Sequence, residues 1–352
     1  MSDIQDQVRD AVGELIRSGA ERGLQVAVFH DGTQVVDVAA GTDATGREIT
    51  AATPVAALST GKGLAATVVH VLAERGVLGY DTRIADVWPE FGVEGKETAT
   101  VRHLLTHAVG LPALPEGVTA DDLREPDAIA ARLAASAPVW EPGTQVGYHA
   151  QTWGYLTGEL VRRTAGRRIS EVLRDEVAGP LGVADELYFG VPAAEQPRVA
   201  RLEEAPGYAD MVAMFGSPVP PTAELCNRAD VLAADNPAGG VLSARAVARM
   251  YAALLGETGG VRLVGPDRLR ELSAVAYDGP DAVMGMPTLC ALGYGIGRPG
   301  ERQPVRTVFG MPGVGGSAAW ADTATGTAFA ITTTRLHPGT APALARIQEL
   351  IA

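Results

Sequence analysis

The chain has 352 residues, of which 46% are hydrophobic, so it can bury a large core in one domain or in two closely packed ones. Its formal net charge of −13 weighs against nucleic acid or an anionic membrane as a partner, because phosphate binding needs clustered Lys and Arg. No stretch reaches the length of a membrane span, and the two cysteines indicate neither a disulfide framework nor a metal site.

The N-terminal segment predicts a helix followed by a β-hairpin. Apolar residues recur at helical spacing from Ile4 to Ile16, which is typical of an amphipathic helix. Strands are then expected over 24–30 and 33–39, joined by Asp31-Gly32, a strong two-residue hairpin signal. The opening residues are acidic and polar and lack the basic and apolar regions of a signal peptide, which favours a cytoplasmic location.

The most informative motif is Ser59-Thr-Gly-Lys62, at the start of a long apolar helical segment. Residues three apart on a helix share a face, so Lys62 can reach the Ser59 hydroxyl. A lysine whose pKa is lowered by burial can accept the serine proton, and the free N–H of Ser59 can bind an oxyanion. A pattern with only two fixed residues, Ser and Lys, occurs by chance in many proteins. The alternative interpretation is therefore a serine at a helix start followed by a solvated lysine, without a catalytic role.

The middle of the chain, 61–239, has a helical pattern punctuated by Pro and Gly. Within it, a Pro142-Gly143 turn is followed by Tyr148 at the opening of an apolar helix. A tyrosine has a pKa of about 10, so it can work as a base at neutral pH only beside a cation such as Lys62. The looser stretch 205–236 is either a loop that lines a cleft or a plain surface connection.

The C-terminal part predicts strands over 305–309, 317–322 and 327–334 and a closing helix near 341–352. If the strands from both ends of the chain pair, they form one antiparallel sheet flanked by the first and last helices. We therefore expect a discontinuous α/β domain from 1–60 and 240–352 and a mainly helical inserted domain over 61–239. The active site is expected in the cleft between the two.

The motifs and their order resemble the serine β-lactamase-like family, which includes class C β-lactamases, family VIII-type esterases, D-alanyl-D-alanine peptidases and transacylases. Besides Ser59, Lys62 and Tyr148, the resemblance rests on Ile84-Ala-Asp-Val-Trp-Pro89, Val101-Arg-His-Leu-Leu-Thr-His-Ala-Val-Gly-Leu-Pro112, Asn236-Pro-Ala-Gly-Gly-Val-Leu-Ser243 and Phe309-Gly-Met-Pro-Gly-Val-Gly-Gly-Ser317. It implies the β-lactamase/transpeptidase-like α/β fold. It also implies that Ser59 is the nucleophile, Lys62 its proton partner and Tyr148 the base or acid, with the N–H groups of Ser59 and Val314 as oxyanion hole.

Two departures from the family pattern concern the substrate. Where β-lactamases have Lys-Thr-Gly and related esterases often have His-x-Gly, this chain has Met311-Pro312-Gly313, so a neutral thioether replaces the cation. Where β-lactamases have Tyr-x-Asn, Ala150 takes the place of the amide. Met311 and Gly313 are expected to contact substrate. His149 is expected either to contact substrate or to be a half-exposed histidine without that role. Pro312, which has no N–H, suggests an edge strand. Both losses argue against β-lactam or peptidyl-carboxylate substrates.

Other motifs support competing chemistry weakly. His103 and His107 have the i, i+4 spacing of a helical zinc motif, but Leu104 stands where a metalloprotease has its glutamate. The glycine-rich stretch 310–317 has Gly316 in place of the phosphate-binding lysine of a P-loop. We expect no metal and no cofactor.

The sequence thus predicts a serine hydrolase or acyltransferase acting on a small-molecule ester or amide, with water, an alcohol or an amine as acyl acceptor. An intracellular esterase or a biosynthetic transacylase is favoured over a β-lactamase. The competing hypothesis is a catalytically silent binding or scaffold protein that keeps the fold.

Overall fold

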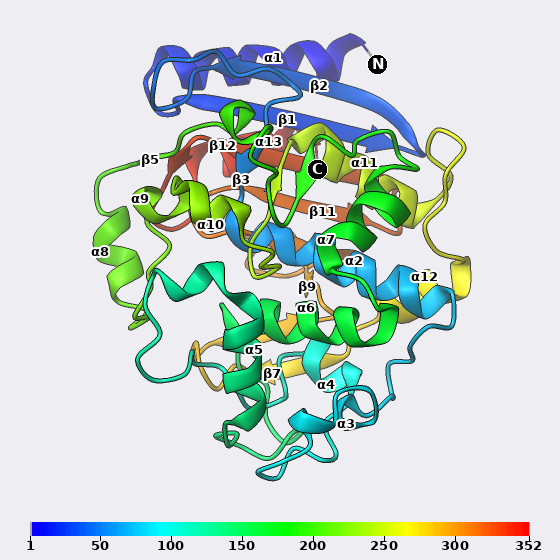
Figure 1. The fold of residues 1–352 in the computed structure, drawn as a ribbon. Helices are drawn as coiled ribbons and strands as arrows, with labels where there is room; N and C mark the ends of the chain where they lie inside the picture. The colour runs from blue at the N-terminus through cyan, green and yellow to red at the C-terminus, as the bar shows by residue number, and fades with distance from the viewer. Residues whose placement is uncertain (1, 352) are drawn as a thin grey trace.

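An eight-stranded antiparallel sheet forms the centre of the computed structural model, which describes residues 2–351 (Figure 1). Its strands, in spatial order, are β2 (Thr33–Gly41), β1 (Gly23–His30), β12 (Thr327–Thr333), β11 (Ala318–Asp322), β10 (Val308–Pro312), β9 (Gly295–Ile296), β8 (Pro287–Cys290) and β7 (Tyr277–Pro280). The β1–β12 pairing joins the two ends of the chain, from Leu24 opposite Thr333 to His30 opposite Thr327. The predicted terminal sheet is therefore confirmed.

Both faces of this sheet are covered, because the β1 side chains alternate between two cores. Val26 and Val28 belong to the core under the terminal helices α1 (Ser2–Arg17) and α13 (Pro342–Ile351). Ala27 and Phe29 belong to the larger core on the other face, which α11 (Ala244–Leu255) covers. Figure 1 shows α1 along the outer face of β1 and β2, so the predicted flanking helices are confirmed.

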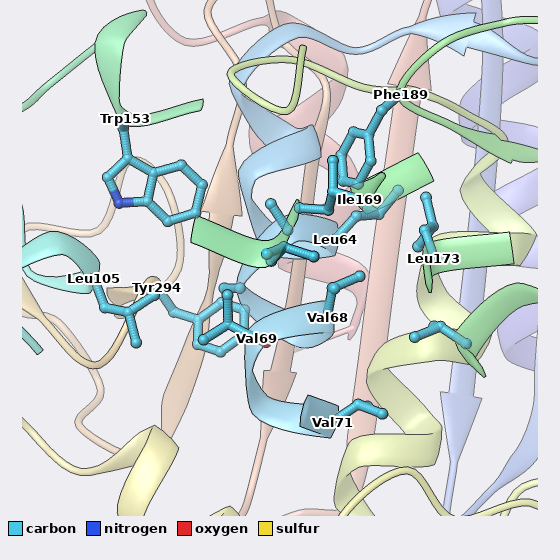
Figure 2. Close-up of a cluster of buried hydrophobic side chains, with 14 of the residues drawn as sticks. Leu64, Val68, Val69, Val71, Leu105, Trp153, Ile169, Leu173, Phe189 and Tyr294 are labelled. Atoms are coloured by element: carbon cyan, nitrogen blue, oxygen red, sulfur yellow. The ribbon is translucent and has the colours of Figure 1, made fainter. Parts of the chain in front are cut away.

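Helix α2 (Gly61–Glu74) runs through the interior, and each of its residues from Gly61 to Ala73 is buried. A helix that is apolar around its whole circumference must be covered on all sides. Figure 2 shows the side chains around it, with Leu64 and Val68 beside Ile169 and Val69 beside Tyr294. This central position holds the N-terminal end of α2 rigidly, and Ser59 lies just before that end.

The remaining elements surround α2 and the sheet. The longer helices are α5 (Pro126–Ala135), α6 (Thr152–Ala165) and α12 (Pro266–Ser273). The shorter ones are α3 (Ile84–Val87), α4 (Val101–Leu105), α7 (Ile169–Val172), α8 (Tyr208–Ala213), α9 (Ala223–Cys226) and α10 (Ala229–Ala233). Two small sheets pair β3 (Val55–Ala56) and β4 (Leu187–Tyr188) with β6 (Val241–Leu242), and β13 (Arg335–Leu336) with β5 (Glu203–Glu204).

Two details of the C-terminal strands differ from the sequence-based expectation. The strand expected over 305–309 begins at Val308 and continues to Pro312, because a turn closed by the Val308 N–H on the Val305 carbonyl (3.1 Å) precedes it. Strand β10 is also an interior strand and not an edge strand. Pro312 is tolerated because β9 pairs with β10 only at Phe309 and Gly310, so the missing N–H breaks no ladder bond on that side.

The division into two domains stays a prediction. Among residues 2–351, no helix combines the length and the apolar character needed to cross a bilayer.

Candidate active site

The Ser59 side chain is presented by a tight turn. Residues Leu58–Thr60 form one turn of 3-10 helix directly before α2, and Leu58 adopts a left-handed φ of 51°. Such a backbone is costly for a branched side chain and is common at functional sites. Within residues 2–351 the Ser59 N–H has no hydrogen-bond acceptor. Ser59 is partly exposed and lines a large cleft, so its hydroxyl and its N–H are both available to a ligand.

Lys62 lies one turn further along, fully buried, with Nζ 3.0 Å from the Ser59 Oγ. Its second hydrogen bond goes to the Ala238 carbonyl, at 2.7 Å. Nζ is also 5.3 Å from the centroid of the Tyr148 ring. Burial lowers the pKa of Lys62 below its ordinary value of 10.5, and the Tyr148 hydroxyl offsets part of that shift. The neutral amine, which can accept a proton, is thereby made more accessible at neutral pH.

Tyr148 is held by its backbone. Its N–H donates to the Asp281 carboxylate (2.9 Å), which comes from the connection between β7 and β8. The preceding Gly147 N–H donates to the His107 carbonyl (3.1 Å). The ring stands 4.9 Å from the His107 ring, centroid to centroid. Two distant segments therefore fix a tyrosine beside Lys62, in the cleft that Ser59 also lines.

The expectation that His149 contacts substrate is wrong, and so is the expectation that it is half-exposed. Its side chain is fully buried, with Nδ1 bonded to the Gly147 carbonyl and Nε2 accepting from the Leu111 N–H (2.9 Å). Burial lowers its pKa to about 4, so it is neutral at physiological pH. His149 is a structural residue that ties the Tyr148 segment to the chain after α4.

His107 lines the cleft instead. Its Nδ1 accepts the His149 N–H (3.1 Å), which leaves the proton of the neutral ring on Nε2. Burial, aided by His149 and Lys62, keeps its pKa well below 6.5. Its φ of 60° is another left-handed backbone at the site. The His103 ring, by contrast, accepts the Thr100 N–H (3.4 Å) in a helix cap, so the two histidines serve different purposes.

The segment that carries the second predicted oxyanion donor, Val314, packs against the turn that carries Ser59. Gly313, directly after β10, is so close to the serine turn that a Cβ there would lie 2.3 Å from the Ala57 carbonyl oxygen. The Ser317 carbonyl accepts from both the Gly313 N–H (2.8 Å) and the Thr60 hydroxyl (3.1 Å), which ties the two segments together. The Val314 N–H has no acceptor within residues 2–351 and lines the cleft.

One cleft of about 1220 Å³ collects these groups. Ser59, Tyr148, Met311, Gly313 and Val314 line it, whereas Lys62 lies behind Ser59 and His149 lies outside it. The cleft wall includes Ala150, at the position where β-lactamases have an asparagine. Met311 also lines the cleft, and its side chain is almost fully buried. The stretch 205–236 contributes many lining residues, so its expected position at the cleft is confirmed. It is not one loop, however, because α8, α9 and α10 lie within it.

Three contributions to the site were not predicted from the sequence. Asp281 and the Ala238 carbonyl act from segments far from Ser59 in the chain, and no local pattern indicates that the one binds the Tyr148 N–H or that the other binds Lys62. His107 carries a weak signal, because histidine is among the residues that tolerate a left-handed backbone at a helix end. The i, i+4 spacing of His103 and His107 is that of a helical zinc motif and does not indicate that the His107 ring lines the cleft.

Known proteins resemble this chain in sequence and in fold. The family described as Beta-lactamase matches residues 8–352. The esterase/beta-lactamase LipL of Mycobacterium tuberculosis H37Rv is 36% identical over 340 residues, which cover 89% of this chain and 77% of LipL. The structure is similar to a family VIII carboxylesterase (33% identity, TM-score 0.91, 99% and 96% of the two chains). It is also similar to a penicillin-binding protein homologue from Caulobacter crescentus (31% identity, TM-score 0.89, 99% and 97%).

Proposed function

This chain belongs to the beta-lactamase family, and from that premise we propose that it is a serine esterase or acyltransferase that forms an acyl-enzyme on Ser59. One observation carries the proposal: a fully buried lysine with its Nζ 3.0 Å from a serine hydroxyl that faces a cleft. A buried ammonium is costly unless a carboxylate pairs with it, and within residues 2–351 the Lys62 Nζ donates instead to the Ser59 hydroxyl and the Ala238 carbonyl. A scaffold protein would gain nothing from that arrangement.

In the proposed first half-reaction, neutral Lys62, assisted by Tyr148, takes the hydroxyl proton as the Ser59 oxygen attacks the carbonyl carbon. The N–H groups of Ser59 and Val314 stabilise the tetrahedral oxyanion. The C–O or C–N bond to the leaving group then breaks, and Tyr148 protonates the departing alcohol or amine. Water, or an alcohol or amine in a transacylase, then repeats these steps in reverse to release the acyl group and restore Ser59.

The substrate is proposed to be a neutral ester or amide, with an ester favoured by the named relatives LipL and the family VIII carboxylesterase. Met311 and Ala150 stand at two positions of the cleft where β-lactamases grip a carboxylate and an acylamino group. We therefore expect poor hydrolysis of nitrocefin and penicillins. The acceptor, water or an alcohol or amine, and a cytoplasmic location stay predictions.

Covalent labelling tests the proposal directly. A fluorophosphonate probe should add one probe mass to the intact protein, and peptide mapping should place it on Ser59. Ser59→Ala should lose the label and reduce hydrolysis of p-nitrophenyl butyrate by at least about a thousandfold. Ser217, a second serine on the same cleft, provides the matched control, and Ser217→Ala should still be labelled. A label on any other residue, or activity of Ser59→Ala within about tenfold of the wild type, would remove Ser59 from the mechanism.

A further inference from the structure

The cleft is larger and more apolar than the reaction itself requires. Its volume of about 1220 Å³ exceeds the roughly 300–1,000 Å³ of ordinary small-molecule sites. Beyond the catalytic groups, its wall is largely hydrocarbon and thioether. Examples of these lining residues are Leu58, Leu114, Leu123, Phe189, Leu232 and Met311. A short acyl group such as acetyl or butyryl would leave most of this surface in contact with water.

The cleft also offers no partner to a charged substrate group. Within residues 2–351, neither lysine nor arginine lines it. Asp281 is the acidic residue of the lining, and its carboxylate already accepts the N–H groups of Tyr148, Val283 and Met284, at 2.8–2.9 Å. An ionised substrate group would therefore lose its hydration without compensation. The substrate part that fills the cleft must be uncharged.

Exposed apolar side chains gather at the mouth of the same cleft. Met214 and Phe215, directly after α8, are 85% and 50% exposed, and Val283 and Met284, in the β7–β8 connection, are 46% and 48% exposed. All four line the cleft, and Met286 beside them is 56% exposed. Concentrated exposed apolar surface marks a binding site, whereas single exposed apolar residues are ordinary.

Polar anchors hold the backbone of both mouth loops. The Ser217 hydroxyl donates to the Gln151 side chain (2.8 Å) and accepts the Val219 N–H (3.1 Å), which fixes the first loop. The second loop is fixed by the Asp281 carboxylate through the N–H groups of Val283 and Met284. These polar groups of the two loops therefore find their hydrogen-bond partners within the protein. The exposed apolar side chains of the same loops remain free to contact a ligand. Methionine side chains are unbranched and flexible, so they suit a flexible chain better than a rigid ring.

We propose that the substrate is a neutral ester carrying a long hydrocarbon chain, of about eight carbons or more, which lies in the cleft and contacts both mouth loops. This inference rests on the proposed function, because the ester carbonyl must reach Ser59. The chain belongs to either the acyl or the alcohol part, and both are tested below.

Two series of esters test chain length. The first is p-nitrophenyl acetate, butyrate, octanoate and decanoate, and the second is ethyl, octyl and decyl acetate followed by proton release, all below their aggregation limits. Each methylene withdrawn from water raises kcat/KM by up to about fourfold. With partial burial we expect a rise of at least about thirtyfold from the shortest to the longest ester in one series or both. A decline beyond butyrate in the first series, with no rise in the second, overturns the proposal.

Loop variants locate the effect. In whichever ester series rises with chain length, Met214→Ser with Phe215→Ser, and separately Val283→Ser with Met284→Ser, should each lower the longest-to-shortest ratio of kcat/KM at least about tenfold. Val139→Ser is the matched control, because Val139 is 71% exposed and does not line the cleft, and its ratio should stay that of the wild type. Loop variants whose ratio equals that of Val139→Ser also overturn the proposal.

Fluorophosphonate labelling separates the two possible failures. If Ser59 is labelled but neither ester series rises with chain length, the long-chain proposal is wrong and the proposed function stands. If Ser59 is not labelled and no ester is hydrolysed, the proposed function is wrong, and the long-chain proposal falls with it.

Discussion

Adding one methyl group at Gly313 should damage the proposed oxyanion hole while leaving Ser59, the proposed nucleophile, in place. A Cβ at this position would lie 2.3 Å from the Ala57 carbonyl oxygen and 2.8 Å from the Thr60 Oγ1. Both atoms belong to the turn that carries Ser59, so the methyl group would push the two halves of the oxyanion hole apart. Gly313 does not have a positive φ, which means that Gly313→Ala acts through this contact and not through the backbone conformation.

The size of the effect follows from the distance. Restoring an ordinary contact requires about 1 Å of movement, from 2.3 Å to 3.4 Å. A shift of that size takes the Val314 N–H out of hydrogen-bonding range of the oxyanion. Loss of one such donor lowers kcat by about 10²–10³, and the overpacking itself costs about 1–3 kcal/mol of stability. The value of KM should change little, because the lost interaction is made mainly in the transition state.

Steady-state hydrolysis of p-nitrophenyl butyrate, measured with thermal unfolding of the same samples, checks this. Gly239→Ala is the matched control, because Gly239 also lies beside the serine turn but its Cβ would be 3.6 Å from the nearest atom. That variant should keep kcat within about threefold of the wild type. If folded Gly313→Ala also keeps kcat within about threefold, the Val314 N–H does not take part in the reaction.

Three further predictions concern the base, the cleft wall and the buried histidines. Tyr148→Phe should lower kcat by about 10²-fold or more, and an unchanged rate would mean that the lysine works alone. Met311→Lys should raise kcat/KM for carboxylate-bearing esters relative to neutral ones by about 1.5–3 kcal/mol of selectivity, whereas an equal gain for every ester would indicate a repaired proton-transfer network. Acid should destabilise the fold, because burial lowers the pKa of His70 to about 3, of His149 to about 4 and of His107 well below 6.5. The unfolded chain binds these protons near pH 6.5 and the native state only at lower pH, so the free energy of unfolding should fall below about pH 6.5, by up to about 4 kcal/mol per pH unit for three histidines. Urea unfolding at a series of pH values measures this, and a flat profile between about pH 6.5 and pH 4 contradicts it.

Local sequence determined the elements and the order of the motifs. The Asp31-Gly32 signal predicts the β1–β2 hairpin, and both residues do adopt positive φ, 46° and 74°. The helix spacing of Ser59 and Lys62 predicts their contact, which the structure has at 3.0 Å. These are short-range relations in which the backbone geometry of one element sets the distance, so no tertiary contact is needed to infer them.

The roles of His107, His149 and Asp281 were decided by tertiary structure alone. Asp281 and His107 approach Tyr148 from other segments of the chain. The sequence does not show that the His149 imidazole is buried in the protein and that the His107 imidazole lines the cleft. Which ring is buried depends on which one can form hydrogen bonds with buried backbone groups. His149 forms two, with the Gly147 carbonyl and the Leu111 N–H.

The extent of the cleft also depends on tertiary structure. Met214 and Val283 are about seventy positions apart in the chain, and nothing in either local pattern indicates that they share one apolar mouth. Hydrophobic periodicity predicts which side chains an element buries against its neighbours, but these two residues lie in loops without a period. Only the folded chain brings the two loops to one cleft, where both residues line it and stay exposed.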